Sequence, residues 1–397
     1  MKEQQLDEKL KVLQFCDNYY PQIDGVVKVV DNTTRIINER SSAKVVVPKY
    51  KKKAYDDSAF PYDVLRRKTS SITFNGIEIP LPQKTKDLTA FIKEYKADIY
   101  HIHSPFFVGR YALKLAKETN TPVIGTFHSQ FKKDVLSVTH SELIADALVK
   151  NIVGVFNQCT EVWAPSKSTA NVLRSYGYEK EIFIMENGTD FTYPDNIQET
   201  VAQAKRLYDI QDGRKNLLFV GQIRDVKNIP LILETLKELL KTDCSYHLYL
   251  VGEGSDKAKY EKWIIEREIQ NNVHFLGKIT DRTLLAGVYA VCDLFFFPST
   301  YDNAPIVVRE SCAMRTPVLL PLGSVAAEPF TDGVNGYLAE ENAMAMKEKI
   351  LKIFQYPKEM KKIGERASNE IPITYEKMVD KTLDRYKAII RQFRGNK

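Results

Sequence analysis

The chain has 397 residues, of which 44% are hydrophobic and 27% are charged, and its formal net charge at pH 7 is +6. This composition is ordinary for a soluble globular protein, and the modest net charge disfavours a dedicated nucleic-acid binder. The length exceeds what one small core organises, so we expect two domains of roughly 150 to 200 residues each.

The cysteines and the N-terminal residues indicate in which cellular compartment the protein is expected. Five cysteines are present, an odd number without a Cys-x-x-Cys pair, which favours a reduced protein over a disulfide framework. The start MKEQQLDEKLKVLQF has no apolar signal segment, and no apolar run approaches the roughly 18 residues of a membrane span. We therefore expect a cytoplasmic protein that can still sit at the inner surface of the membrane.

The first half of the chain alternates short apolar runs with longer amphipathic ones. The apolar runs predict strands at residues 11–15, 44–47, 98–103, 122–128 and 161–165. The amphipathic runs predict helices at residues 26–40, 109–119 and 142–159. Strands that alternate with helices of this length indicate parallel βαβ units with helices on both faces of a sheet.

The same alternation restarts after the turn-rich stretch 183–196. Strands are predicted at residues 216–221, 247–254, 273–277, 293–297 and 317–321, with helical segments between them. Residues 375–393 predict a long amphipathic C-terminal helix. We therefore predict an α/β protein with two Rossmann-like, doubly wound domains, residues 1–190 and 191–374, and a C-terminal segment 375–397 that crosses back to the first domain. In such sheets the ligand site lies beyond the carboxyl ends of the strands, in a shared cleft.

The stretch PSTYDNAPIVVRESCAMRTPV follows a predicted strand and carries two carboxylates, Asp302 and Glu310. Asn303 is a candidate helix cap and Pro305 suits a first helical turn, so the helix N-terminus would offer N–H groups to an anion. For Glu310 two interpretations stay open. It forms an ion pair with a nearby Arg or Lys, or it accepts hydrogen bonds from vicinal hydroxyls such as those of a ribose.

Upstream, LLFVGQIRDVKNI combines a strand, the turn glycine Gly221 and the cations Arg224 and Lys227. Such a turn suits a phosphate, because backbone N–H groups and cations both bind it. Surface cations are, however, usually just solvated. The Gly-x-Gly of LVGEGSD, Gly252 and Gly254, indicates a plain turn more than a nucleotide site.

In the first half, Gly25 opens a helix after DNYYPQID, and His128 follows a strand end in TFHSQF. Both positions suit a residue that faces the cleft, although a lone histidine is more often structural. His101 and His103 alternate on a strand and are expected to share one face. A metal site needs further ligands that the sequence does not supply, so we predict none.

The ordered set of motifs resembles the retaining glycosyltransferases of family 4, which have the GT-B fold. The motifs extend over nearly the whole chain: YPQIDGVV, HIHSP, PVIGTFHS, VWAPSKST, ENGTD, FVGQIRDVKN, YLVGEG, VHFLGKI, DLFFFPSTYDNAPIVVRESCAMRTPV and DGVNGYL. The YDNAP variant and the PQIDGVV loop are similar to bacterial diacylglycerol glucosyltransferases. By this resemblance the first domain would bind the acceptor and the second the nucleotide sugar.

The resemblance also implies roles for individual residues. Glu310 would bond the ribose of the donor, and Asp302 the hydroxyls of the transferred sugar. Lys227 would bind the diphosphate, with Gly221 and Arg224 beside it. His128 would lie beside the reacting sugar, and the backbone of Gly25 would approach the donor phosphate. The backbone surrounding sugar and diphosphate would be that of Asn303, Ala304, Pro305, Ile306 and Val307.

Three positions depart from the family pattern. Gln222 replaces a common arginine after Gly221, Asp302 is one methylene shorter than the usual glutamate, and Arg315 stands where glycine is common. Arg224 is close enough to substitute for the missing arginine. Together the departures keep a non-catalytic partner protein as an alternative. A sugar-nucleotide epimerase is another, and a glycoside hydrolase is disfavoured because its carboxylates must flank the scissile bond.

The implied chemistry is the transfer of a hexose from a nucleotide-diphosphate sugar, with a UDP-sugar favoured, to a lipid or envelope-glycan acceptor. The anomeric configuration would be retained, and Lys227 and Arg224 would stabilise the leaving diphosphate without a metal. No cofactor is expected beside the donor. The stretch 44–68, with eight cations against three acids, is a candidate contact with an anionic membrane, although a solvated loop is at least as common.

Overall fold

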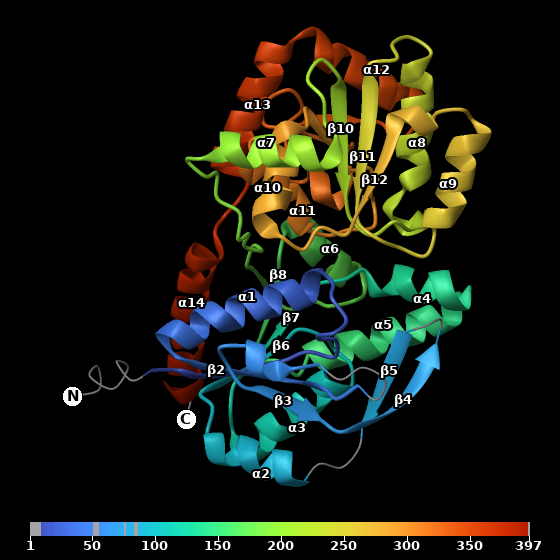
Figure 1. The fold of residues 1–397 in the computed structure, drawn as a ribbon. Coiled ribbons are helices and arrows are strands. Elements are labelled where there is room, and N and C mark those ends of the chain that lie inside the picture. The colour runs from blue at the N-terminus through green and yellow to red at the C-terminus, as the bar shows by residue number, and fades with distance from the viewer. Residues whose placement is uncertain (1–8, 51–54, 75–76, 83–85, 396–397) are drawn as a thin grey trace. The chain divides into compact units, whose positions relative to one another are not determined.

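The computed structural model describes residues 9–50, 55–74, 77–82 and 86–395. The chain divides into two compact units, each with its own sheet (Figure 1). Unit 1 is Met1–Gly188 together with Tyr375–Lys397, and unit 2 is Thr189–Thr374. The sequence placed this boundary between residues 190 and 191. None of the helices in the described ranges combines the length and the apolar character needed to cross a bilayer.

Unit 1 is built on a parallel sheet with the strand order β3-β2-β1-β6-β7-β8-β9. Its strands are β1 (Lys11–Phe15), β2 (Ser42–Pro48), β3 (Val64–Arg67), β6 (Ile99–Ile102), β7 (Val123–Thr126), β8 (Glu161–Ala164) and β9 (Ile182–Ile184). Four of the five β1 residues are buried, as expected for a parallel sheet covered on both faces. The three-residue strand β9 was not predicted, because turn residues dominate its surroundings. A separate antiparallel ribbon joins β4 (Thr69–Phe74) and β5 (Ile77–Pro82).

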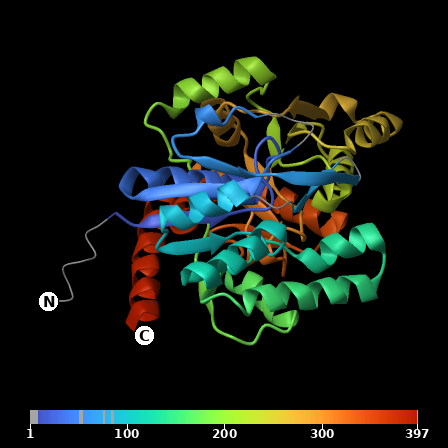
Figure 2. The same cartoon turned by 90° about the horizontal axis from the view of Figure 1, so that it is seen from below.

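Helices complete unit 1. They are α1 (Gly25–Arg40), α2 (Lys86–Tyr95), α3 (Phe107–Thr119), α4 (Phe131–Thr139), α5 (Glu142–Phe156), α6 (Lys167–Ser175) and α14 (Tyr375–Gly395), with the short 3-10 turn η1 (Asp57–Ala59). The C-terminal helix α14 packs beside α1 (Figure 2). Its Tyr386 is fully buried, and its Arg385 forms a two-pronged ion pair with Glu161 of β8. The predicted return of the C-terminal helix to the first domain is therefore confirmed.

Unit 2 repeats the plan with the strand order β12-β11-β10-β13-β14-β15, again all parallel. The strands are β10 (Lys215–Val220), β11 (Tyr246–Val251), β12 (Val273–Gly277), β13 (Leu294–Phe296), β14 (Val318–Pro321) and β15 (Tyr337–Ala339). The helices are α7 (Ile197–Tyr208), α8 (Ile229–Leu240), α9 (Lys257–Glu266), α10 (Arg282–Val291), α11 (Ile306–Ala313), α12 (Ala343–Gln355) and α13 (Pro357–Glu370). Short 3-10 turns are η2 (Asp225–Lys227), η3 (Gln270–Asn272) and η4 (Val325–Ala327). Helices lie on both sides of this sheet (Figure 1), so the predicted pair of Rossmann-like sheets is confirmed.

The strand order of each sheet reverses at one point. In unit 1 the chain moves outward from β1 to β3 and then restarts at β6 on the other side of β1; in unit 2 the same reversal lies between β10 and β13. Loops that leave such neighbouring strands diverge, and the space between them is where open α/β sheets bind ligands. The loops after β1, β10 and β13 carry Gly25, Lys227 and Asp302, so the topology brings predicted site residues to both reversal points.

Candidate active site

The reversal point of unit 2 holds an ion pair between two predicted site residues. The Lys227 Nζ of η2 lies 2.6 Å from the Asp302 Oδ1 of the loop after β13. The two side chains are only 15% and 18% exposed. The second carboxylate oxygen, Asp302 Oδ2, is buried and has no hydrogen-bond partner within the described ranges. A carboxylate oxygen in this state is costly to leave unmet, so it marks a place for a hydrogen-bond donor.

Glu310 lies in α11, is 5% exposed and uses both carboxylate oxygens. Its Oε1 accepts from the Arg282 guanidinium at 2.7 Å, and its Oε2 accepts from the Tyr289 hydroxyl at 3.0 Å. Arg282 also binds both oxygens of Asp190, with an Nε–Oδ2 distance of 2.8 Å. The ion pair that the sequence left open is therefore present. It does not exclude ribose hydroxyls, because each carboxylate oxygen can accept two hydrogen bonds.

This network stabilises the charged form of its arginine. Burial by itself would lower the pKa of Arg282, but Glu310 and Asp190 outweigh burial, so the pKa lies above its ordinary value. Burial, followed by the charge of Glu310, raises the pKa of Tyr289, which keeps the hydroxyl protonated as a donor to the carboxylate. Glu310 is consequently held in place by a fixed cation and a neutral donor.

The predicted cap of α11 is wrong. The helix begins at Ile306 with Pro305 at the N-cap position, and no side chain caps it. Asn303 lies two positions before the cap, too far to reach the N2 and N3 amides that a capping side chain serves. Pro305 therefore precedes the first turn rather than forming it. The first amides of α11 are not occupied by a side-chain cap.

The glycines noted in the sequence differ in how closely their surroundings constrain them. A Cβ at Gly252 would lie 1.9 Å from the Gly221 carbonyl oxygen, and one at Gly254 would lie 2.1 Å from the Ile223 carbonyl oxygen. These glycines let two loops pack backbone to backbone, which is a structural reason for the Gly-x-Gly motif. A Cβ at Gly25, by contrast, would meet nothing within 4 Å. Neither packing nor φ therefore explains Gly25.

Two of the departures from the family pattern have simple structural settings. Arg315 adopts a φ of 59°, the left-handed conformation that favours glycine, and its guanidinium lies 3.9 Å from the centre of the Tyr193 ring. Gln222 and Arg224 are both exposed. Within the described part of the chain, the Arg224 side chain has no ion-pair or hydrogen-bond partner. Neither departure disturbs the Lys227–Asp302 pair.

The predicted residues of unit 1 follow the carboxyl ends of strands in its sheet. Gly25 is the first residue of α1, which Asp24 caps by accepting from the Val27 amide at 2.9 Å. His128 follows β7, and its Nε2 lies 3.1 Å from the Nδ1 of His103. The predicted common face of His101 and His103 is confirmed, because their rings stack with centroids 4.1 Å apart.

The histidine cluster of His101, His103 and His128 is neutral. Burial lowers the pKa of His101 to about 3 and that of His128 to about 4, and it holds the pKa of His103 well below its usual range. The rings border a small cavity of about 20 Å³, room for one water molecule, together with Thr126 and Tyr386. Among the described residues, no three His, Cys, Asp or Glu side chains are arranged to hold a metal ion.

The basic stretch 44–68 is partly neutralised. Lys44 pairs with Asp63, and Arg66 pairs with Asp57 at 2.7 Å. Arg67 lies over the Tyr111 ring at 4.2 Å. Lys51, Lys52 and Lys53 fall outside the described residues. Membrane contact by this stretch stays a prediction.

Several residues of these sites were missed by the sequence analysis. Arg282 and Tyr289 lie on α10, for which no motif was weighed, and Asp190 belongs to ENGTD, which was noticed without a role. Asp17 was also missed. It accepts from the Val108 amide at 2.6 Å and from the Ser104 hydroxyl at 2.9 Å, which joins the loops after β1 and β6. Only the tertiary structure shows these partners.

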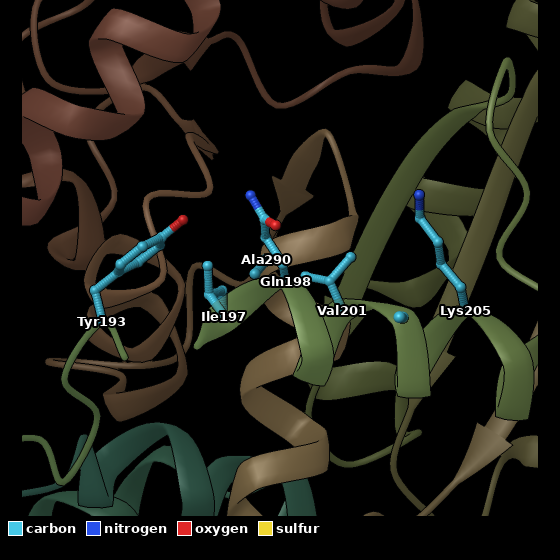
Figure 3. Close-up of a pocket in the computed structure, with 7 residues that line it drawn as sticks. Tyr193, Ile197, Gln198, Val201, Lys205 and Ala290 are labelled. Atoms are coloured by element: carbon cyan, nitrogen blue, oxygen red, sulfur yellow. The ribbon is translucent and has the colours of Figure 1, made fainter. Parts of the chain in front are cut away.

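A surface hollow of about 360 Å³ lies apart from these residues. It is bounded by α7 and by neighbouring side chains of the same unit, and the lining residues are Tyr193, Ile197, Gln198, Val201, Ala202, Lys205 and Ala290 (Figure 3). None of the predicted site residues lines it. Its cation, Lys205, is paired with Asp212 at 2.5 Å. The size of a hollow therefore does not locate the candidate site.

Comparison with known families decides the class of protein. Residues 23–193 match the model of the family described as "Glycosyltransferase Family 4", and residues 202–370 match that of "Glycosyl transferases group 1". The chain belongs to the GT-B glycosyltransferases. The family inferred from the motifs is thereby confirmed, and the glycosyltransferase is an enzyme, as expected.

Named relatives agree with this assignment. The chain is 26% identical over 317 residues to an alpha-monoglucosyldiacylglycerol synthase of Streptococcus pneumoniae, covering 78% of this chain and 70% of the relative. A protein of the same name from Acholeplasma laidlawii is 24% identical over 374 residues, covering 89% and 90%. A crystal structure of Anabaena HepE in complex with UDP superposes with a TM-score of 0.74 at 16% identity, covering 95% of this glycosyltransferase and 100% of HepE. The last comparison supports the fold.

Proposed function

We propose that this glycosyltransferase is a retaining hexosyltransferase that uses a UDP-sugar and acts on a lipid or envelope-glycan acceptor at the membrane surface. The observation that carries the donor half is the buried, unmet oxygen of Asp302 beside the Lys227 ammonium. A sugar hydroxyl suits the first and a diphosphate oxygen the second, and a nucleotide sugar offers both at a short separation.

The leaving diphosphate would be stabilised by charge already present in unit 2. Lys227 lies at the reversal point, Arg224 is exposed next to it, and the uncapped first amides of α11 follow the Asp302 loop. Such preorganised cations and N–H groups act without reorganising during the reaction. We propose that these groups, rather than a metal, stabilise the leaving diphosphate. Full activity in excess EDTA is the expected result, and loss that added Mg²⁺ restores would contradict it.

The acceptor assignment rests on the names of the relatives. Both relatives described above are named alpha-monoglucosyldiacylglycerol synthases, and unit 1 carries the basic stretch 44–68. We propose diacylglycerol-type lipid as the first acceptor to try. Co-sedimentation with phosphatidylglycerol vesicles but not with phosphatidylcholine vesicles would support peripheral binding. Equal sedimentation with both, or with neither, would contradict it.

Thermal unfolding with UDP, GDP and ADP, each alone and as its hexose conjugate, tests the donor. One base should stabilise the protein selectively, by about 2.7 kcal/mol at a hundredfold excess over Kd. In Asp302→Ala, binding of the hexose conjugate should weaken while binding of the bare diphosphate nucleotide should not. Weakening of both would contradict the sugar role of Asp302. An α-linked product from an α-linked donor, identified by NMR, would establish retention.

A further inference from the structure

Gln14 is a polar residue in the middle of a buried strand. It is 1% exposed and lies in β1 between Leu13 and Phe15, which are both fully buried. Burying an amide is favourable only when its hydrogen bonds are met. The Gln14 Nε2 donates to the Thr34 Oγ1 of α1 at 2.7 Å, and the Gln14 Oε1 lies 2.7 Å from the His103 Nε2. This side chain therefore joins helix α1 to the histidine cluster.

The direction of these bonds follows from Thr34. Its hydroxyl donates to the Val30 carbonyl oxygen at 2.5 Å, so its single proton is in use and it accepts from the Gln14 amide nitrogen. The Gln14 oxygen consequently faces His103, and His103 must carry its proton on Nε2 in order to donate to it. The other ring atom, His103 Nδ1, is then an acceptor.

The same logic extends one residue further. The His128 Nε2 lies 3.1 Å from the His103 Nδ1. Since His103 accepts at that atom, His128 must donate, which puts its own proton on Nε2. Both rings are kept neutral by burial, so each carries one proton and has a defined tautomer.

From this chain of contacts we infer that Gln14 and Thr34 are positioning residues that fix His128 as the Nε2–H tautomer and make its Nδ1 the acceptor atom. The inference rests on the proposed function only in assuming that His128 faces the donor sugar. An unprotonated Nδ1 can only accept a hydrogen bond, and it cannot give a proton to the leaving phosphate. His128 would therefore orient the sugar and would not act as a general acid.

Nitrogen NMR of the full-length protein tests the assignment directly. With ¹⁵N-histidine labelling, long-range ¹H–¹⁵N correlation distinguishes a protonated from an unprotonated ring nitrogen, and the chain has only six histidines. A His128→Asn variant identifies the signals of His128. We expect a protonated Nε2 and an unprotonated Nδ1 for both His103 and His128. A His128 ring protonated on Nδ1 would overturn the inference.

Variants of α1 separate positioning from general stability. Thr34→Val removes the acceptor for the Gln14 amide, so the amide can flip and reverse the direction of the hydrogen bonds through His103 to His128. A second set of signals, with His128 protonated on Nδ1, should then appear. Thr34→Ser keeps the hydroxyl and should restore the single set. The matched control is Thr33→Val, one residue away, because the Thr33 hydroxyl bonds backbone carbonyls of its own helix. An unchanged spectrum in Thr34→Val would overturn the role of Thr34.

Transfer assays connect the tautomer to the reaction. If His128 orients the sugar, kcat should fall in Thr34→Val in proportion to the share of the second set of signals and recover in Thr34→Ser, with little change in the donor KM. The expected spectra combined with an unchanged kcat would uphold the tautomer assignment while contradicting the proposed contact between His128 and the donor. The two ideas can therefore fail separately.

Discussion

The two units place polar groups at equivalent points of similar sheets but use different chemistry. At the reversal point of unit 1 most of the buried polar groups are neutral, namely three imidazoles with Gln14 and Thr34, and Asp17 is the carboxyl group among them. At that of unit 2 they are charged, namely the pairs Lys227–Asp302 and Arg282–Glu310. Neutral groups act through the direction of their hydrogen bonds, whereas charged groups act through their field. The difference suits a first unit that orients a sugar and a second that binds an anionic nucleotide.

The largest expected effect is a loss of folding stability in acid, because acid protonates the neutral histidine cluster of unit 1. Because the folded pKa values of His101 and His128 lie at about 3 and about 4, the unfolded chain takes up more protons below its ordinary histidine pKa of about 6.5. Stability is therefore full above pH 6.5 and is lost as the pH falls toward 4, by about 1.4 kcal/mol per pH unit for each histidine. Burial raises the pKa of Asp17 to about 6. Its contribution to stability therefore increases as the pH falls and offsets part of this loss.

Urea unfolding at pH 7.5, 6.5 and 5.5 measures the summed loss, to which His247 of unit 2 contributes because burial lowers its pKa to about 4, and hydrogen exchange shows which unit opens. Peptides that contain β6 and β7 should lose protection before peptides that contain β13. Exposed His140 provides the control, since His140→Gln should leave the pH dependence unchanged. Equal stability at all three pH values would show that the cluster is not held neutral.

Removal of the Glu310 charge should have the next largest effect. In Glu310→Gln the amide oxygen still accepts from Arg282 or Tyr289, and Asp190 still pairs with the arginine, so we expect a stability loss of about 1–2 kcal/mol. Donor affinity, measured by calorimetry with the nucleotide, should fall tenfold to a hundredfold. Asp190→Asn is the matched control, because it takes the other carboxylate from the same arginine. Equal loss of affinity in both variants, or an unfolded Glu310→Gln protein, would favour a purely structural ion pair.

The two cations of the phosphate turn should differ. Lys227→Met removes a mostly buried charge, so donor binding should weaken about tenfold to a hundredfold, the value of one charge-assisted hydrogen bond. Arg224→Met removes an exposed charge, which is worth less than about 1 kcal/mol, or under about fivefold. Nucleotide titrations at low and high salt provide the comparison. A larger loss for Arg224→Met would mean that Arg224 has taken the place of the arginine missing at Gln222.

The smallest effect concerns Arg315. Its left-handed backbone costs a non-glycine residue about 1 kcal/mol, which the contact with Tyr193 partly offsets. Arg315→Gly should therefore be more stable than Arg315→Ala by about 1 kcal/mol, with transfer activity unchanged in both. Chemical denaturation resolves this difference. Altered activity in either variant would point to a role in the site.

The sequence by itself determined the class of fold and the family. Alternating apolar and amphipathic runs specify βαβ units because burial on both faces of a parallel sheet leaves that periodicity in the chain. The motif order predicted Asp302, Glu310, Lys227 and His128 as site residues, and the topology brings Lys227 and Asp302 into contact. Helix α11 was predicted correctly but its cap was predicted wrongly, since a cap depends on backbone geometry before the first turn.

Only the tertiary structure decided which side chains meet. Arg282 is 28 residues from Glu310, and Gln14 is 89 residues from His103, so no local pattern signals either contact. Buried polar groups must find partners wherever the fold places them, and those partners set charge, tautomer and orientation. For this glycosyltransferase the residue types follow from the sequence, while the proton positions and ion pairs that give them their chemistry follow from the packing of distant segments.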